Sequence, residues 1–88
     1  MYGLTSQARR SAVSVPANIA EGYGRQNLGS YVHFLKIAQG SLKELETHFE
    51  IAARIEYIDG ACLGEIVSLC DGVGKPLRGL ISKLSEAD

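Results

Sequence analysis

The sequence predicts an all-α fold, an antiparallel helical bundle of three long helices. Apolar residues recur at helical spacing along three segments, about Leu4–Arg25, Ser30–Glu56 and Ala61–Ser85. Glycines and other turn-forming residues separate the segments. The chain has 88 residues, 45% hydrophobic and 22% charged, which is typical of a globular protein. We therefore expect a single helical domain over residues 1–88.

The first segment is apolar on two sides. One face carries Leu4, Ala8, Ala12, Val15, Ile19 and Gly22, and the far side carries Val13, Ala17 and Ala20. A helix at the edge of a domain needs only one covered face, so the second side is expected to meet a neighbour. Pro16 is expected to bend this helix. Gly22 and Gly24 are interpreted as the residues that end it, rather than as a phosphate-binding loop.

The second segment has the clearest periodicity, and Ser30 is its expected N-cap. Its main apolar stripe consists of Tyr31, Phe34, Leu35, Ala38, Leu42, Leu45, Phe49 and Ala52. The opposite, charged face, which includes Lys36 and Lys43, is expected to be solvated. A further apolar strip of Ile37, Ile51 and Ile55 gives this helix a second apolar side, as in the first helix. Gly40 predicts a close approach between helices.

The third segment has one broad apolar face, formed by Leu63, Ile66, Val67, Cys70, Val73, Leu77, Leu80, Ile81 and Leu84. Pro76 lies inside it and predicts a kink, because proline cannot donate to the carbonyl four residues earlier. Cys62 and Cys70 are eight residues apart on one helix, too far for a disulfide between them. We interpret them as reduced, small hydrophobic residues, and no cofactor is expected.

Charge and hydropathy narrow the classes of function. Nine basic and ten acidic residues give a net charge of −1, with a pI of about 6.1, so there is no overall attraction to nucleic acids or anionic membranes. Any such binding must be local. The sequence has neither a signal-peptide pattern nor an apolar run of the ~18 residues that a membrane span requires. A cytoplasmic protein is expected.

A polar seam is predicted between the two apolar sides of the first helix. It consists of Ser14, Asn18, Glu21 and Arg25, joined by Glu44 from the second helix. We interpret this polar seam as a hydrogen-bonded network that fixes the register between helices. The alternative is a polar pocket that binds a ligand. Glu44 is expected to form an ion pair with an arginine such as Arg10.

Candidate metal-binding and catalytic residues do not match known motifs. Glu44 and His48 are four residues apart, but the Glu-x-x-His motif of di-iron bundles is missing. No serine has a histidine at a motif-defined spacing, and the cysteines lie on an apolar stripe. A protein without enzymatic activity is therefore expected.

The stretches SVPANIAEGYGR and FLKIAQGSLKELET carry a resemblance to a known family. They resemble the four-helix-bundle family of intervening-sequence proteins, which are encoded within bacterial large-subunit ribosomal RNA genes and elsewhere and include accessory proteins of diversity-generating retroelements. The most specific residues are Ser14, Pro16, Asn18, Ile19, Ala20, Glu21, Gly22, Gly24 and Arg25, then Phe34, Leu35, Ala38, Gly40, Ser41, Glu44, Leu45 and Thr47. The resemblance implies a small cytosolic bundle, commonly a five-membered ring, without established catalytic residues.

The sequence departs from that family in two places. Family members have a further amphipathic helix before the position of Leu4, so the three helices here correspond to a four-helix-bundle pattern whose first helix is absent. A truncated gene, a misassigned start codon, or a bundle completed by another subunit would each explain this. Pro76 is the second departure, in a helix that the family continues without proline.

The leading functional hypothesis is a noncatalytic oligomeric helical bundle, an assembly or RNA-associated adaptor. Its expected contacts between copies are the exposed apolar residues Val13, Ala17, Ala20, Ile37, Ile51 and Ile55, and its candidate RNA-binding cations are Arg9, Arg10 and Arg25. The alternative is a small-molecule or metal-binding bundle that uses Glu21, Arg25, Glu44 and His48.

Overall fold

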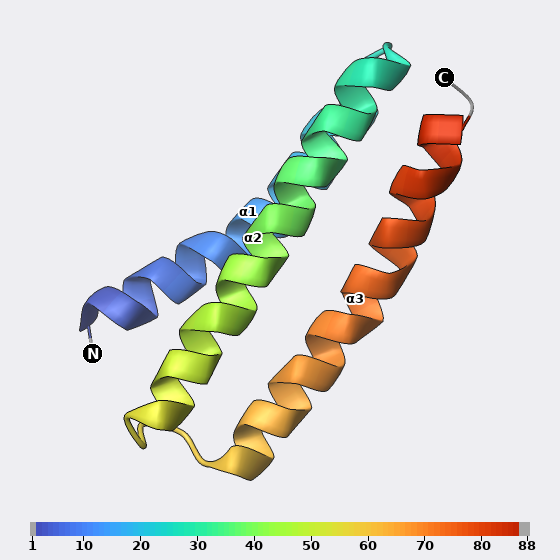
Figure 1. Cartoon of the computed structure of the whole chain (residues 1–88). Coiled ribbons are helices and arrows are strands. Elements are labelled where there is room, and N and C mark those ends of the chain that lie inside the picture. Colours follow the sequence, from blue (N-terminus) through green and yellow to red (C-terminus); the bar gives the residue numbers. More distant parts are fainter. Residues whose placement is uncertain (1, 87–88) are drawn as a thin grey trace.

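The computed structural model describes residues 2–86 and confirms the all-α prediction (Figure 1). Helix α1 runs over Tyr2–Gly24, α2 over Leu28–Arg54 and α3 over Gly60–Glu86. The helices are antiparallel, with α2 packed against both others. Within the described range, no Cα atom of α1 lies within 8 Å of one in α3. The fold is therefore an open layer in which α2 is the shared partner.

The core lies along α2, where the main apolar stripe was predicted. Leu35 and Ala38 are completely buried, and Leu42 and Ala52 are nearly so. Helix α1 contributes Val15 to this cluster, and α3 contributes Cys70, Leu77 and Ile81. The predicted broad face of α3 is only partly covered, since Val73 and Leu80 remain exposed.

The turn between α1 and α2 corrects one prediction. The N-cap of α2 is Asn27, whose side-chain oxygen accepts from the backbone N–H of Ser30 at 2.9 Å. Ser30 lies in the first turn of the helix and does not cap it. Asparagine is among the preferred capping residues, so the N-cap lies three residues earlier than predicted.

The turn between α2 and α3 uses local backbone chemistry. Glu56 has a φ of 61°, in the left-handed region, and the N–H of Tyr57 donates to the Ala52 carbonyl at 2.8 Å. The Asp59 carboxylate then accepts from the N–H of Cys62 at 2.8 Å and caps the start of α3. These bonds satisfy helix-end groups and return the chain alongside α2.

The internal prolines do not end their helices, whereas one glycine marks a close contact between helices. Helices α1 and α3 both continue through their internal prolines, Pro16 and Pro76, and α1 changes direction along its length (Figure 1). The close approach expected at Gly40 is wrong, because a Cβ there would meet no atom within 4 Å. The close approach lies at Gly22, where a Cβ would be 2.8 Å from the Cβ of Phe34.

The apolar strips that were predicted to lack cover are exposed in this chain. They comprise Val13, Ala17 and Ala20 on α1, and Ile37, Ile51 and Ile55 on α2. Val13 is 66% exposed, and α3 adds Leu69 at 73%. None of the helices in residues 2–86 has the length and hydrophobicity needed to cross a membrane.

Candidate functional site

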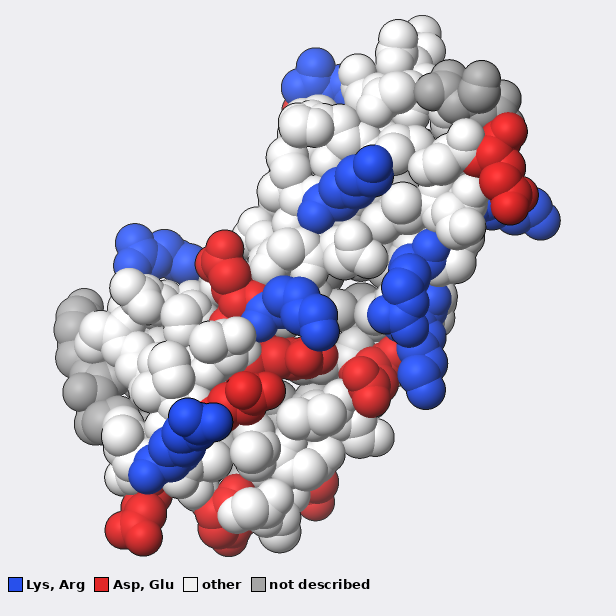
Figure 2. Space-filling view, in the orientation of Figure 1, with Lys and Arg blue, Asp and Glu red and all other residues white. Residues whose placement is uncertain are grey.

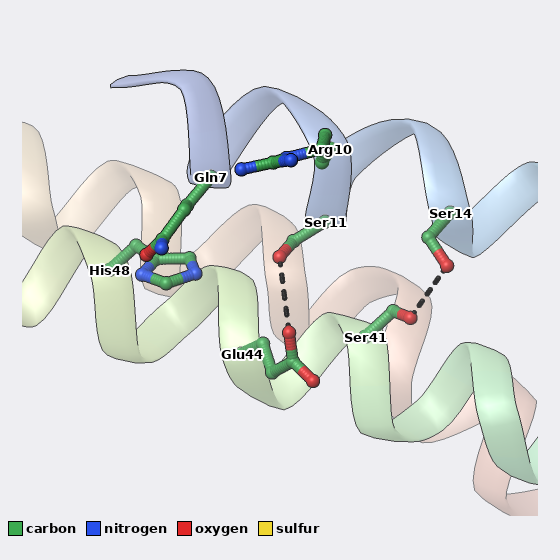
Figure 3. Close-up of a pocket in the computed structure, with 7 residues that line it drawn as sticks. All are labelled: Gln7, Arg10, Ser11, Ser14, Ser41, Glu44 and His48. Carbon is green, nitrogen blue, oxygen red and sulfur yellow. Dashed lines mark hydrogen bonds between the residues drawn. The ribbon is translucent and has the colours of Figure 1, made fainter. Parts of the chain in front are cut away.

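A polar pocket of about 470 Å³ lies between α1 and α2 and is the first candidate site (Figure 3). Its lining comes from about two turns of each helix. The residues are Gln7, Arg10, Ser11 and Ser14 from α1, and Ser41, Glu44 and His48 from α2. The pocket forms because these polar residues face one another beside the apolar contact of the two helices.

The inner end of the pocket is a hydrogen-bonded cluster. The hydroxyls of Ser14 and Ser41 are 2.8 Å apart, one from each helix. The Asn18 amide donates to the Ser14 carbonyl at 2.8 Å and to the Ser14 hydroxyl at 2.9 Å. Small side chains that bond across the interface allow close packing and favour one register of α1 against α2.

Ser11 is the most buried polar residue of the pocket, with only 5% of its surface exposed. Its hydroxyl donates to Glu44 Oε2 over a long 3.5 Å (Figure 3). The expected ion pair between Glu44 and Arg10 is wrong, because no Arg10 nitrogen in the structure lies within 4.0 Å of a described carboxylate. Arg10 therefore leaves its guanidinium available at the rim of the pocket (Figure 3).

The rest of the predicted polar seam lies elsewhere. Arg25 donates to Glu21 at 2.7 Å, and both side chains are about half exposed. The Arg25 guanidinium also lies 5.1 Å from the centroid of the Phe34 ring, a cation–π geometry. Ser14, Asn18 and Glu44 are thus part of the pocket or its hydrogen-bonded end, while Glu21 and Arg25 form a separate exposed pair.

The candidate RNA-binding arginines do not form one patch. Arg10 lines the polar pocket, whereas Arg9 lines a separate apolar pocket of about 340 Å³ between α1 and the end of α2. Arg25 follows the C-terminus of α1, roughly 22 Å along the helix from Arg10 at 1.5 Å per residue. The three arginines therefore lie in three different environments and do not form a shared cationic surface.

The polar pocket presents groups that can hydrogen-bond to a ligand. Among the described residues, no serine donates to a histidine, and no three His, Cys, Asp or Glu residues gather as a set of metal ligands. The pocket offers a guanidinium, hydroxyls, an amide, an imidazole and one carboxylate, which suit a small polar molecule. Sequence reasoning missed Gln7 and Ser11 as pocket residues and named Ser41 only through the family resemblance. The signal for Ser11 and Ser41 was their alignment with Ser14 and Glu44 on facing helix sides.

An open helical layer with a polar interhelical pocket defines a small all-α protein of the bundle class. The family model of the 23S rRNA-intervening sequence protein matches residues 1–79. The chain therefore belongs to the 23S rRNA-intervening sequence protein family, in agreement with the resemblance noted in the sequence. No curated protein matches it significantly.

Proposed function

We propose that this protein is a noncatalytic, cytoplasmic helical module that assembles with other copies of itself and associates with RNA. The observation that carries the proposal is the uncovered apolar surface. In residues 2–86, no Cα atom of α1 lies within 8 Å of one in α3, and apolar side chains remain exposed on all three helices.

Burial energetics support assembly. A fully buried aliphatic side chain contributes about 1.5–3 kcal/mol relative to an exposed one. Val13, Ile37, Ile51, Ile55 and Leu69 are all large apolar residues with substantial exposure. Covering several of them offsets the cost of association, and a domain of this size gains from additional burial. The five-membered ring implied by the family resemblance is the proposed form.

Light scattering during size-exclusion chromatography tests assembly. We expect a mass that is a multiple of the 9.5 kDa chain and that falls on dilution if the association is reversible. A monodisperse monomer throughout the micromolar range would refute the assembly part.

The RNA part is tested separately, by gel shift with structured RNA at low ionic strength. Its support is the family membership together with cations on α2 and α3 that have no carboxylate within 4.0 Å among the described residues, such as Lys36 and Arg78. Phosphate contacts weaken as salt rises, so the shift should be lost progressively with added salt. No shift at low salt would remove RNA from the proposal.

A second candidate is binding of a small polar molecule, favoured by the pocket that Arg10, Ser11 and His48 line. The metal version of this alternative receives no support from geometry, because Glu21 pairs with Arg25 away from Glu44 and His48. Native mass spectrometry of freshly purified protein is the test, with elemental analysis for metals. A stoichiometric adduct that Arg10→Gln removes would favour this function over the adaptor.

A further inference from the structure

A groove between α2 and α3 gathers cations that are far apart in the sequence. It has a volume of about 450 Å³, and Lys36 and Lys43 of α2 line it together with Lys75 and Arg78 of α3. Figure 2 shows Lys and Arg side chains over this face, where the two helices lie side by side. We call these four residues and the space between them the basic groove.

The basic groove carries a local positive charge. Its four cations face two carboxylates, Glu46 and Asp71, so four minus two leaves a lining charge of +2 in a chain of net charge −1. Lys36, Lys75 and Arg78 have no carboxylate within 4.0 Å among the described residues. Lys43 approaches Glu46 at 3.9 Å, with a side chain that is 81% exposed. An ion pair at that distance, with so exposed a lysine, is weak.

The antiparallel register separates the two signs of charge. Gly74 lies opposite Leu42, since a Cβ on Gly74 would be 3.2 Å from Leu42 Cδ2. From that point Lys75 and Arg78 run along α3 toward the level of Lys36, whereas Asp71 lies on the other side, toward Glu46. The pKa of the Cys70 thiol indicates the same placement, because burial first and then both carboxylates raise it. Three of the four cations, Lys36, Lys75 and Arg78, therefore occupy one end of the groove, and Lys43 lies nearer the carboxylates.

The spacing fits a chain of negative charges. Lys36 and Lys43 are separated by two helical turns, roughly 10.5 Å along α2, and Lys75 and Arg78 by about one turn, roughly 4.5 Å along α3. Cations spread over that length can contact successive phosphates of one strand at the same time. Among the described residues, no aromatic side chain lines the groove, so these residues give it no surface on which bases would stack.

We propose that the basic groove binds the phosphodiester backbone of a nucleic acid, without reading its sequence. The inference deepens the proposed function. It rests on that proposal for the choice of RNA, rather than DNA, as the source of the phosphates. It assigns the contact to α2 and α3 instead of to Arg9, Arg10 and Arg25. An acidic peptide would present similar charges, and its binding is one of the outcomes that the experiment below distinguishes.

Fluorescence anisotropy with labelled RNA, and with DNA of the same sequence, tests the assignment. The groove variant is Lys36→Gln/Lys75→Gln/Arg78→Gln, and the matched control is Arg9→Gln/Arg10→Gln/Arg25→Gln, which removes the same charge. Relative to wild type, we expect the groove variant to bind RNA about tenfold more weakly. The slope of log affinity against log salt concentration, measured between about 50 and 200 mM salt, should be shallower by about 2. The control should stay within about twofold of wild type. Circular dichroism verifies that both variants remain helical.

Each other outcome has a defined meaning. A loss confined to the arginine control would leave RNA association standing and overturn the groove assignment. Equal losses in both variants would also overturn it, because net charge alone would then explain binding. Polyglutamate competing as well as RNA would refute the phosphodiester assignment, and tighter binding of DNA would refute RNA as the source. No binding by wild type to either nucleic acid at low salt would refute both the inference and the RNA part of the proposed function.

Discussion

Gly22 of α1 packs directly on Phe34 of α2, so closely that a Cβ on the glycine would lie 2.8 Å from the Cβ of Phe34 and 3.2 Å from the Tyr31 carbonyl oxygen. Neither obstacle can move easily, because one atom is fixed by the backbone direction and the other is backbone. The aromatic ring of Phe34 in turn supports the Arg25 guanidinium. This contact sets how near the C-terminal end of α1 approaches α2.

Gly22→Ala should therefore destabilise the fold by about 1–3 kcal/mol, the usual cost of forcing an additional methyl group into a packed interface. Gly40→Ala is the control, because that site is also helical but open. It should stabilise the protein by up to about 1 kcal/mol through helix propensity. Urea denaturation followed by circular dichroism measures both, and effects of the same sign would contradict the assigned contact.

Leu42→Asp should unfold the domain, whereas Lys43→Asp should change stability by about 1 kcal/mol or less. Leu42 is nearly buried beside Gly74, and an unpaired carboxylate there costs several kcal/mol, comparable with the typical total stability of about 5–15 kcal/mol. Lys43 projects into solvent. Far-ultraviolet circular dichroism in urea compares them, and similar unfolding midpoints would show that the helical phase is wrong.

Ile51→Lys should dissociate the proposed assembly without loss of helix, since Ile51 is an exposed apolar residue outside the core cluster. Glu50→Lys is the neighbouring control on the charged side of α2. Leu69→Lys extends the test to the exposed face of α3. Light scattering at several concentrations gives the mass of each variant. An unchanged mass for Ile51→Lys, with a reduced mass for Leu69→Lys, would move the interface from α2 to α3.

Stability should decrease in alkaline solution partly through Cys70. Burial, then Glu46 and Asp71, raise the pKa of this thiol above its ordinary value of 9.0. The folded protein therefore holds the thiol proton more tightly than the unfolded chain. That contribution is complete below the ordinary pKa and is lost as the pH rises through the raised, folded-state pKa. Cys70→Ala should flatten the fall in unfolding free energy above about pH 9, as measured by urea denaturation. Cys62→Ala, as the control, should leave the slope unchanged, and an unchanged slope in Cys70→Ala would refute the assignment.

The sequence by itself determined the three helices and the faces that they bury. Helical periodicity is a local property, so the stripe containing Leu35, Ala38 and Leu42 could be identified without knowing its partners. The exposed strip with Ile37 and Ile51 was visible for the same reason. Boundaries were less accurate where two capping residues competed, as with Asn27 and Ser30.

Only the tertiary structure decided which residues meet across helices. Periodicity does not specify the axial register between two helices, so it could not distinguish Gly22 from Gly40 as the close contact or Ser11 from Arg10 as the partner of Glu44. The same register brings Lys75 and Arg78 into one groove with Lys36. On its own helix each of these cations is an ordinary solvated residue. Their combined field depends on distances between helices, which the packing of Leu42 against Gly74 sets.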